Sequence, residues 1–192
     1  MPTPNPAALD FLTTRRSRPA KTLAEPGPDR EALRPLLTAA ARVPDHGKLE
    51  PWRFVVAEGA ARHRLRDLAQ ERGAALGMEP EKVAKAAGAF LQGGVVVAVI
   101  AAPVASDKIP EAEQLMSAGC VCLGLLNAAL SAGWGANWLT GFTATDRPFL
   151  EAAFGLAAPA FVAGYIHIGT ETVAPPERPR PDIDAITRWL PA

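Results

Sequence analysis

The stretch from about Glu111 to Ala132 constrains the fold more than any other part of the chain. Its pattern is helical and apolar on nearly all sides, so a helix here needs cover all round and belongs at the centre of the molecule. Two apolar runs, Val95 to Ala105 and Ala160 to Ile168, are typical of buried strands. The first is interrupted by Pro103 and falls short of the roughly 20 residues that span a bilayer, so we do not expect a membrane segment.

Periodicity and capping residues predict seven further elements. The expected helices are Ala7 to Thr14, a segment capped by Asp29 that begins late or kinks at Pro35, about Ala61 to Arg72, Pro80 to Leu91, and a segment capped by Thr145 that ends at Gly155; the expected strands are Trp52 to Ala57 and Trp134 to Thr140. Helices and short strands interleave without an even βαβ alternation, which predicts an α+β fold. The 192 residues fit a single domain.

Charge and cysteine content narrow the class of protein. Twenty Lys plus Arg balance twenty Asp plus Glu, so no summed positive field exists to attract nucleic acid or an anionic membrane. The two cysteines, Cys120 and Cys122, point to opposite sides of a helix and cannot easily bridge each other. Residues 1–6 lack the basic and apolar regions of a signal peptide. These features predict a cytoplasmic protein that binds neither nucleic acid nor membrane.

Three segments are polar or glycine-rich where the flanking pattern does not require it. They are Arg15-Arg16-Ser17, the loop from Arg42 to Trp52 that carries His46, and the stretch from Gly133 to Gly141. Guanidinium pairs match a phosphate or an electron-rich ring edge, a rigid loop places binding groups accurately, and small residues let a flat ligand approach the backbone. The alternatives are a solvated basic corner, an exposed histidine and core tryptophans.

The rest of the sequence gives no further candidate for a catalytic or metal-binding site. His63 is expected to be exposed on a helix, and His167 to lie among core residues on a strand. There is no dinucleotide-binding G-x-G-x-x-G after a strand, no Walker motif, no nucleophile elbow and no His/Cys cluster with metal-ligand spacing. We therefore expect no bound metal.

Taken together, the three segments make the chain resemble the flavin-dependent nitroreductase family, most closely its minimal YdjA-like NAD(P)H nitroreductases. The resemblance covers nearly the whole chain. Its carriers are Arg15-Arg16-Ser17, Arg42-x-Pro44-Asp45-His46-x-x-x-x-Pro51-Trp52, Met116-Ser117-Ala118-Gly119-Cys120, Trp138-x-Thr140-Gly141 and Gly164-x-x-x-Ile168-Gly169-Thr170, in the order and spacing of the family.

The resemblance implies a mixed or antiparallel central sheet flanked by helices, and an intertwined homodimer with FMN at the subunit interface. It implies that Arg15, Arg16 and Ser17 reach the pyrimidine edge and the ribityl or phosphate group of FMN. Arg42 and His46 would come from the partner subunit. Further flavin contacts would come from Trp138, Leu139 and Thr140, and the nicotinamide approach would be bordered by Ala128, Ala129, Leu130, Ser131, Ala132 and Gly133.

Two positions depart from the family pattern. Related chains carry Arg at the position of Leu139 and Gln at the position of Glu50. Because a buried phosphate without paired charge is unfavourable, we expect Arg180, helped by Arg178, to replace the missing cation. The tail of residues 170–192, with its apolar Ile183, Ile186, Trp189 and Leu190, is expected to pack on the partner chain.

The activity implied is hydride transfer from NADH or NADPH to FMN and then to a nitroaromatic, quinone or similar small acceptor, in a ping-pong sequence that needs no catalytic residue of the protein. Two alternatives stay open: other flavin chemistry on the same fold, such as a dehydrogenase or dehalogenase, and a non-catalytic flavin-binding protein.

Overall fold

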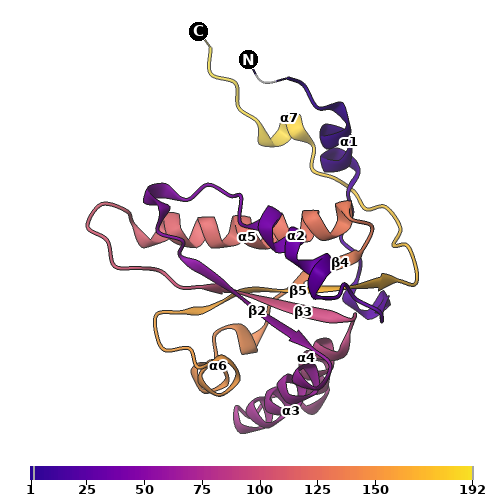
Figure 1. Ribbon diagram of the computed structural model, residues 1–192, viewed down its shortest axis with the longest axis vertical. Coiled ribbons are helices and arrows are strands. Elements are labelled where there is room, and N and C mark those ends of the chain that lie inside the picture. Colours follow the sequence, from indigo (N-terminus) through magenta and orange to yellow (C-terminus); the bar gives the residue numbers. More distant parts are fainter. Residues whose placement is uncertain (2, 192) are drawn as a thin grey trace.

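The computed structural model describes residues 1 and 3–191 of the chain (Figure 1). Its centre is a sheet in which every described strand pair is antiparallel. The strands are β1 (Leu23–Ala24), β2 (Trp52–Glu58), β3 (Val95–Ala101), β4 (Gly135–Leu139) and β5 (Phe161–Glu171). They run in the order β1-β5-β3-β2, and β4 also pairs with β5. Within residues 1 and 3–191, one edge of β2 therefore has no partner strand.

Helices cover both faces of the sheet (Figure 1). The helices are α1 (Pro6–Thr14), α2 (Arg30–Ala40), α3 (Ala60–Ala75), α4 (Pro80–Gly88), α5 (Glu111–Ser131), α6 (Arg147–Phe154) and α7 (Ile183–Ile186), with short 3-10 turns at Ala20–Thr22, His46–Lys48, Ala89–Leu91 and Phe142–Ala144. Helices α2 and α5 pack on one face, and α3, α4 and α6 on the other. The α+β prediction is confirmed.

Strand β3 joins the two hydrophobic cores because it is buried on both faces. Val95, Val97 and Val99 point toward α2 and α5, whereas the alternate residues Val96 and Ile100 point toward α3 and α6. Full burial of a side chain of this size contributes about 1.5–3 kcal/mol. The continuous apolar run that predicted this strand follows from its having no solvent-facing side.

Helix α5 is central, as predicted, but one of its sides lacks cover within this chain. Val121, Cys122 and Leu125 are buried against α2 and the sheet, while Met116 and Leu123 on another side are 64% and 44% exposed. Helix α5 has the length and hydropathy of a membrane span, yet its buried residues belong to the main core. It is the core helix of the fold, with an apolar stripe facing outward.

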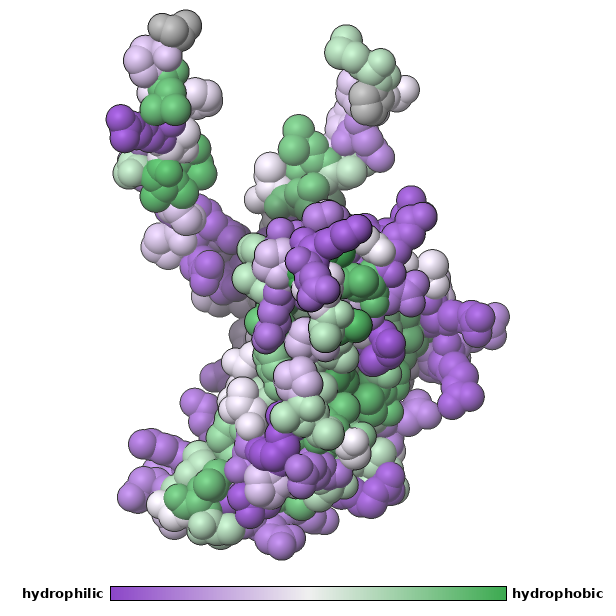
Figure 2. All heavy atoms as spheres, turned by 90° about the vertical axis from the view of Figure 1, so that its left-hand side faces the viewer, coloured by the Kyte–Doolittle hydropathy of each residue, from purple (hydrophilic) through white to green (hydrophobic). Residues whose placement is uncertain are grey.

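The two ends of the chain project from the same end of this body (Figure 1) and form two separate arms when the molecule is turned by 90° (Figure 2). Helices α1 and α7 bury none of their residues. Apolar side chains gather on both arms (Figure 2), and the exposed ones are Leu9, Leu12, Ile183, Ile186, Trp189 and Leu190. This much exposed apolar surface on thin arms is characteristic of segments that pack on another molecule.

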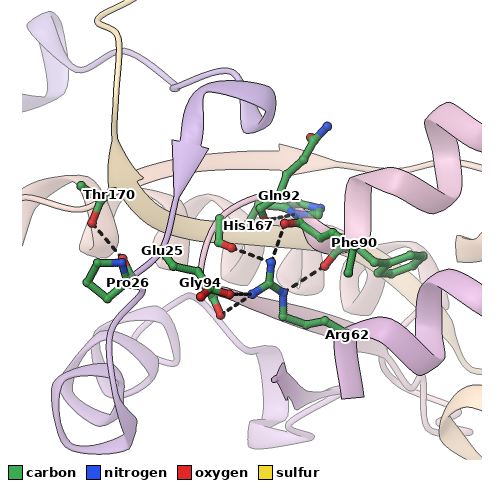
Figure 3. A network of polar contacts seen from close by, with 10 residues as sticks. Glu25, Pro26, Arg62, Phe90, Gln92, Gly94, His167 and Thr170 are labelled. Atoms are coloured by element: carbon green, nitrogen blue, oxygen red, sulfur yellow. Dashed lines mark hydrogen bonds and ion pairs between the residues drawn. The ribbon is translucent and has the colours of Figure 1, made fainter. Parts of the chain in front are cut away.

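Arg62 on α3 ties that helix to the start of β3 (Figure 3). It is 3% exposed, and its guanidinium donates to the carbonyls of Phe90, Leu91, Gly93 and Gly94 and to the Glu25 carboxylate, at 2.6–3.0 Å. All five N–H donors of an arginine are thus used. The network fixes the turn that leads from α4 into the sheet.

Some predicted boundaries were wrong for local reasons. Helix α2 does not begin late: Pro35 lies inside it on the exposed side, and the buried Leu33 and Leu36 hold the helix in place around it. The residue that caps α6 is Asp146 and not Thr145, because the Asp146 carboxylate accepts a hydrogen bond from Phe149 N at 3.0 Å. Strand β5 continues to Glu171 because β1 pairs with its last two residues.

Candidate active site

The arginine segment is held between the end of α1 and strand β4. Helix α1 stops because Arg15 has an extended backbone conformation. The backbone N–H of Arg18 then donates to the Ala136 carbonyl at 2.8 Å, and Asn137 Nδ2 donates to the Arg18 carbonyl at 2.6 Å. These two bonds fix the chain beside the sheet, so that Arg15 and Arg16 occupy defined positions near the C-terminal end of α5.

A cleft of about 290 Å³ opens at this point. Its walls come from the end of α1, the arginine segment, the end of α5 and the end of β5. The lining residues are Phe11, Thr14, Arg15, Arg16, Arg18, Leu130, Gly133, Trp134 and Glu171. Three arginines against one carboxylate, Glu171, give the cleft a positive charge that favours an anionic ligand.

Two more arginines reach the same place from the C-terminal tail. The pKa of Arg15 is lowered, first by partial burial and then by the positive charges of Arg180, Arg16, Arg178 and Arg18. The positive charge of Arg180 therefore acts on Arg15 although 165 residues separate them in the sequence. Five arginines against the two carboxylates that pair with them, Glu171 and Glu177, leave an excess of positive charge that a bound anion would reduce.

Several polar atoms of the cleft have no hydrogen-bond partner. The Nη2 of Arg15 donates to Ser17 Oγ at 2.8 Å, but the Nε atoms of Arg15 and Arg16 are buried and unpaired. Glu171 Oε2 pairs with Arg18 Nε at 3.0 Å, while its Oε1 is buried without a donor. A buried polar group left unpaired costs about 1–3 kcal/mol. The cleft thus offers hydrogen-bond donors and an acceptor to a ligand.

The predicted flavin contacts of β4 lie farther along that strand. Trp138 packs against the core on the α5 side, and its indole ring lies over Gly164, where any Cβ atom would overlap the ring. Leu139 is half-buried and Thr140 exposed. They follow Ala136, the anchor of Arg18, by two to four residues, which corresponds to about 7–13 Å along a strand.

Arg42 and His46 do not reach the cleft within one chain. His46 Nδ1 lies 2.8 Å from Glu113 Oε2 near the start of α5, whereas the cleft is at the other end, near Leu130. Seventeen residues of helix separate Glu113 from Leu130, which is about 26 Å. Arg42 is exposed after the end of α2. Only a second chain could bring these side chains to the arginine cleft.

The backbone of the His46 loop is fixed by Asp45. Its carboxylate accepts from the backbone N–H of Leu49 at 3.2 Å and of Glu50 at 2.8 Å, and Lys48 and Glu50 adopt left-handed backbone conformations. The Glu50 side chain is exposed. Glu, where related chains have Gln, therefore does not change the loop geometry, because backbone conformation and the Asp45 carboxylate hold the loop.

A comparison with family models decides the class of protein: the nitroreductase family matches over residues 12–170. This chain belongs to the nitroreductase family. It is 36% identical over 163 residues to a protein named as an NAD(P)H nitroreductase, YdjA of Escherichia coli strain K12, which covers 85% of this chain and 87% of that protein. A Haemophilus influenzae protein with a similar name is also 36% identical over 165 residues, covering 85% of this chain and 88% of that protein.

Solved structures show the same fold at lower identity. A nitroreductase-like protein of Bacillus cereus superposes with a TM-score of 0.81 at 22% identity, covering 99% of this chain and 98% of that one. A protein of Desulfovibrio desulfuricans named as a nitroreductase, solved in complex with FMN, superposes with a TM-score of 0.73 at 21% identity, covering 98% and 99%. The nitroreductase fold predicted from the motifs is confirmed.

In this nitroreductase, only part of the segment predicted to border the nicotinamide lies at the cleft. Leu130 and Gly133 line the cleft, whereas Ala129 is fully buried in the core. Ser131 and Ala132 are exposed at the helix end, and the Ser131 hydroxyl donates to the Ala128 carbonyl. Leu130 and Gly133 are the two members of this segment that a ligand in the cleft would meet.

Five lining residues were missed by sequence reasoning: Phe11, Thr14, Arg18, Trp134 and Glu171. Arg18 and Thr14 directly flank the motif Arg15-Arg16-Ser17, and Trp134 lies in the glycine- and tryptophan-rich stretch, so proximity was an available signal. No signal in the sequence marked Glu171, because only the pairing of β5 with β1 and β4 brings the end of β5 to this cleft.

Proposed function

We propose that this chain is an FMN-dependent NAD(P)H oxidoreductase whose cofactor binds at the arginine cleft. The observation that carries the proposal is the pair of buried, unpaired Nε donors of Arg15 and Arg16, together with the positive charges of Arg18, Arg178 and Arg180 that also act on Arg15. The FMN-bound relative of the same fold and the NAD(P)H names of the curated relatives support it.

The residues present fit FMN. A phosphate dianion takes the charge-assisted hydrogen bonds that Arg15, Arg16 and the tail arginines offer, and Ser17 adds a hydroxyl. The sugar-like ribityl chain carries hydroxyl donors that Glu171 Oε1 can accept. Trp138, Leu139 and Thr140 offer a surface along β4 for the rest of the cofactor, and Arg180 with Arg178 takes the place of the cation missing at Leu139.

When bound, FMN supplies the redox chemistry, accepting hydride from NADH or NADPH and passing it to a nitroaromatic, quinone or similar acceptor in a ping-pong sequence. The protein positions the cofactor and places positive charge beside it. A guanidinium of Arg15 or Arg16 at the edge of the cofactor stabilises the negative charge that reduction brings. Leu130 and Gly133, on the cleft wall, border the face where the nicotinamide and then the acceptor are held.

We further propose that the active form is a cytoplasmic homodimer in which the tail packs on the partner and each site uses both chains. The outward stripe of α5, the projecting arms and the unpaired edge of β2 are surfaces a second copy can cover. An antiparallel pair of α5 helices would bring the His46 end of one chain to the Arg15 end of the other. Sedimentation that finds a folded, FMN-loaded monomer would contradict this arrangement.

The enzymatic proposal is tested by anaerobic stopped-flow mixing of FMN-reconstituted protein with NADH and, separately, NADPH. We expect fast, saturable bleaching of the flavin band by one donor, reversed by a nitroaromatic or a quinone. Bound flavin that neither donor reduces would instead indicate a non-catalytic or differently driven flavoprotein. Reduction without reoxidation by these acceptors would indicate other flavin chemistry, and protein that binds no flavin would overturn the proposal.

A further inference from the structure

The C-terminal tail carries an anion beside its own arginines. Glu177 Oε1 accepts hydrogen bonds from Arg180 Nε at 2.8 Å and from the Arg178 backbone N–H at 3.0 Å, and lies 2.7 Å from Arg180 Nη2. The positive charge of Arg16 also acts on Glu177, and together these contacts lower the pKa of its carboxyl. Glu177 therefore partly neutralises the positive charge of Arg180 and of Arg16.

The contact uses the part of Arg180 that a phosphate would use. The Nε and Nη2 groups form one edge of the guanidinium fork, the edge that binds two oxygens of a carboxylate or phosphate side by side. In this structure a single carboxylate oxygen takes both. A phosphate that engages this edge of Arg180 has to displace Glu177.

We propose that Glu177 is a built-in counter-ion of the cofactor site, which pairs with Arg180 in the absence of FMN and yields to the FMN phosphate. It thereby lowers the preference of the site for a phosphorylated flavin over one without phosphate. This inference rests on the proposed function and extends it to a residue that sets cofactor specificity.

The other carboxylate of the cluster is placed differently. Glu171 ends strand β5, pairs with Arg18 and has one oxygen buried in the cleft wall. Glu177 lies on a tail without regular structure, and its side chain is 65% exposed. An exposed group on an irregular segment can leave its partner at little cost, whereas Glu171 is held by the strand pairing. Glu177 is therefore the carboxylate that can exchange with a ligand.

The test compares the affinities of the apoprotein for FMN and for riboflavin, the same flavin without its phosphate, by fluorescence titration. In Glu177→Gln we expect FMN to bind about two- to five-fold more tightly, as expected from the energy of an exposed ion pair, with riboflavin unchanged. The control Glu151→Gln removes the same charge from an exposed position on α6. It should leave both affinities unchanged.

A second variant separates the local contact from a general change in charge. In an Arg180→Gln background, Glu177→Gln should no longer strengthen FMN binding, because the shared partner is gone. A ratio of FMN to riboflavin affinity that stays the same or falls in Glu177→Gln would overturn the inference, the second case making Glu177 a positioning residue for Arg180. Wild-type protein that binds neither flavin would instead overturn the proposed function itself.

Discussion

Arg62 is buried and Arg15 is half-buried, but the two side chains differ in their hydrogen-bond partners and in the charges around them. Arg62 donates to four carbonyls and one carboxylate and has no donor to spare (Figure 3). Arg15 has one side-chain bond, to Ser17, an unpaired Nε, and four other arginines near it. A satisfied buried arginine is part of the fold, whereas an unsatisfied one among like charges indicates a site completed by a ligand.

The largest effect is expected from Arg62→Met. It leaves several buried carbonyls unpaired, so the free energy of unfolding should fall by roughly 3–5 kcal/mol, measured by urea denaturation of the apoprotein. Arg64→Met is the matched control, because Arg64 is exposed on the same helix and should change stability by less than about 0.5 kcal/mol. An Arg62→Met protein as stable as this control would show that Arg62 does not stabilise the fold.

The counterpart is Arg15→Met. Removing one charge from the crowded cluster should leave the stability of the apoprotein unchanged or slightly higher. The affinity for FMN should weaken about 10- to 150-fold, the worth of one charge-assisted hydrogen bond, as measured by fluorescence titration. If Arg15→Met destabilises the apoprotein as much as Arg62→Met does, then Arg15 has a structural role and the comparison fails.

A third prediction concerns pH, and its effect near neutral pH is the smallest. His167 is buried beside the Arg62 network, and burial lowers its pKa to about 4. The unfolded chain, with a His pKa of about 6.5, then binds a proton before the folded one does. Stability should therefore fall as pH drops from about 6.5 to about 4, by at most about 1.4 kcal/mol per pH unit. His167→Asn should remove this part of the slope in denaturation curves taken across that range; an unchanged slope would show that His167 can be protonated in the folded protein.

The sequence predicted the secondary structure well where the signal is local. The apolar periodicity of α5 and the uniform run of β3 follow from burial on several sides, and Gly155 ends α6 with the left-handed backbone that glycine adopts readily. The cap of α6 was misplaced by one residue because Thr145 and Asp146 are both good capping residues. Only the backbone geometry selects Asp146.

The site was predictable in part, for the same reason. Short motifs identified the arginine segment, the His46 loop and the strand with Trp138 as candidate binding segments. The resemblance to the nitroreductase family assigned all three to one cofactor. That Glu171 shares a cleft with Arg15 and that Glu177 holds Arg180 could not be predicted, since neither lies in a motif. Nor did the sequence distinguish Arg62, which lies among other arginines on α3 and yet is buried.

The sequence by itself determined the order of helices and strands, the family and the residue types available for an anion site, because each of these depends on local periodicity or on short motifs. The tertiary structure decided which arginines have all their donors hydrogen-bonded and which have buried donors without a partner. That difference arises between segments far apart in the chain: Arg62 donates to carbonyls at the start of β3, whereas the positive charge of Arg180 in the tail acts on Arg15. Whether a charge is paired is a property of its surroundings, and only the folded chain supplies those.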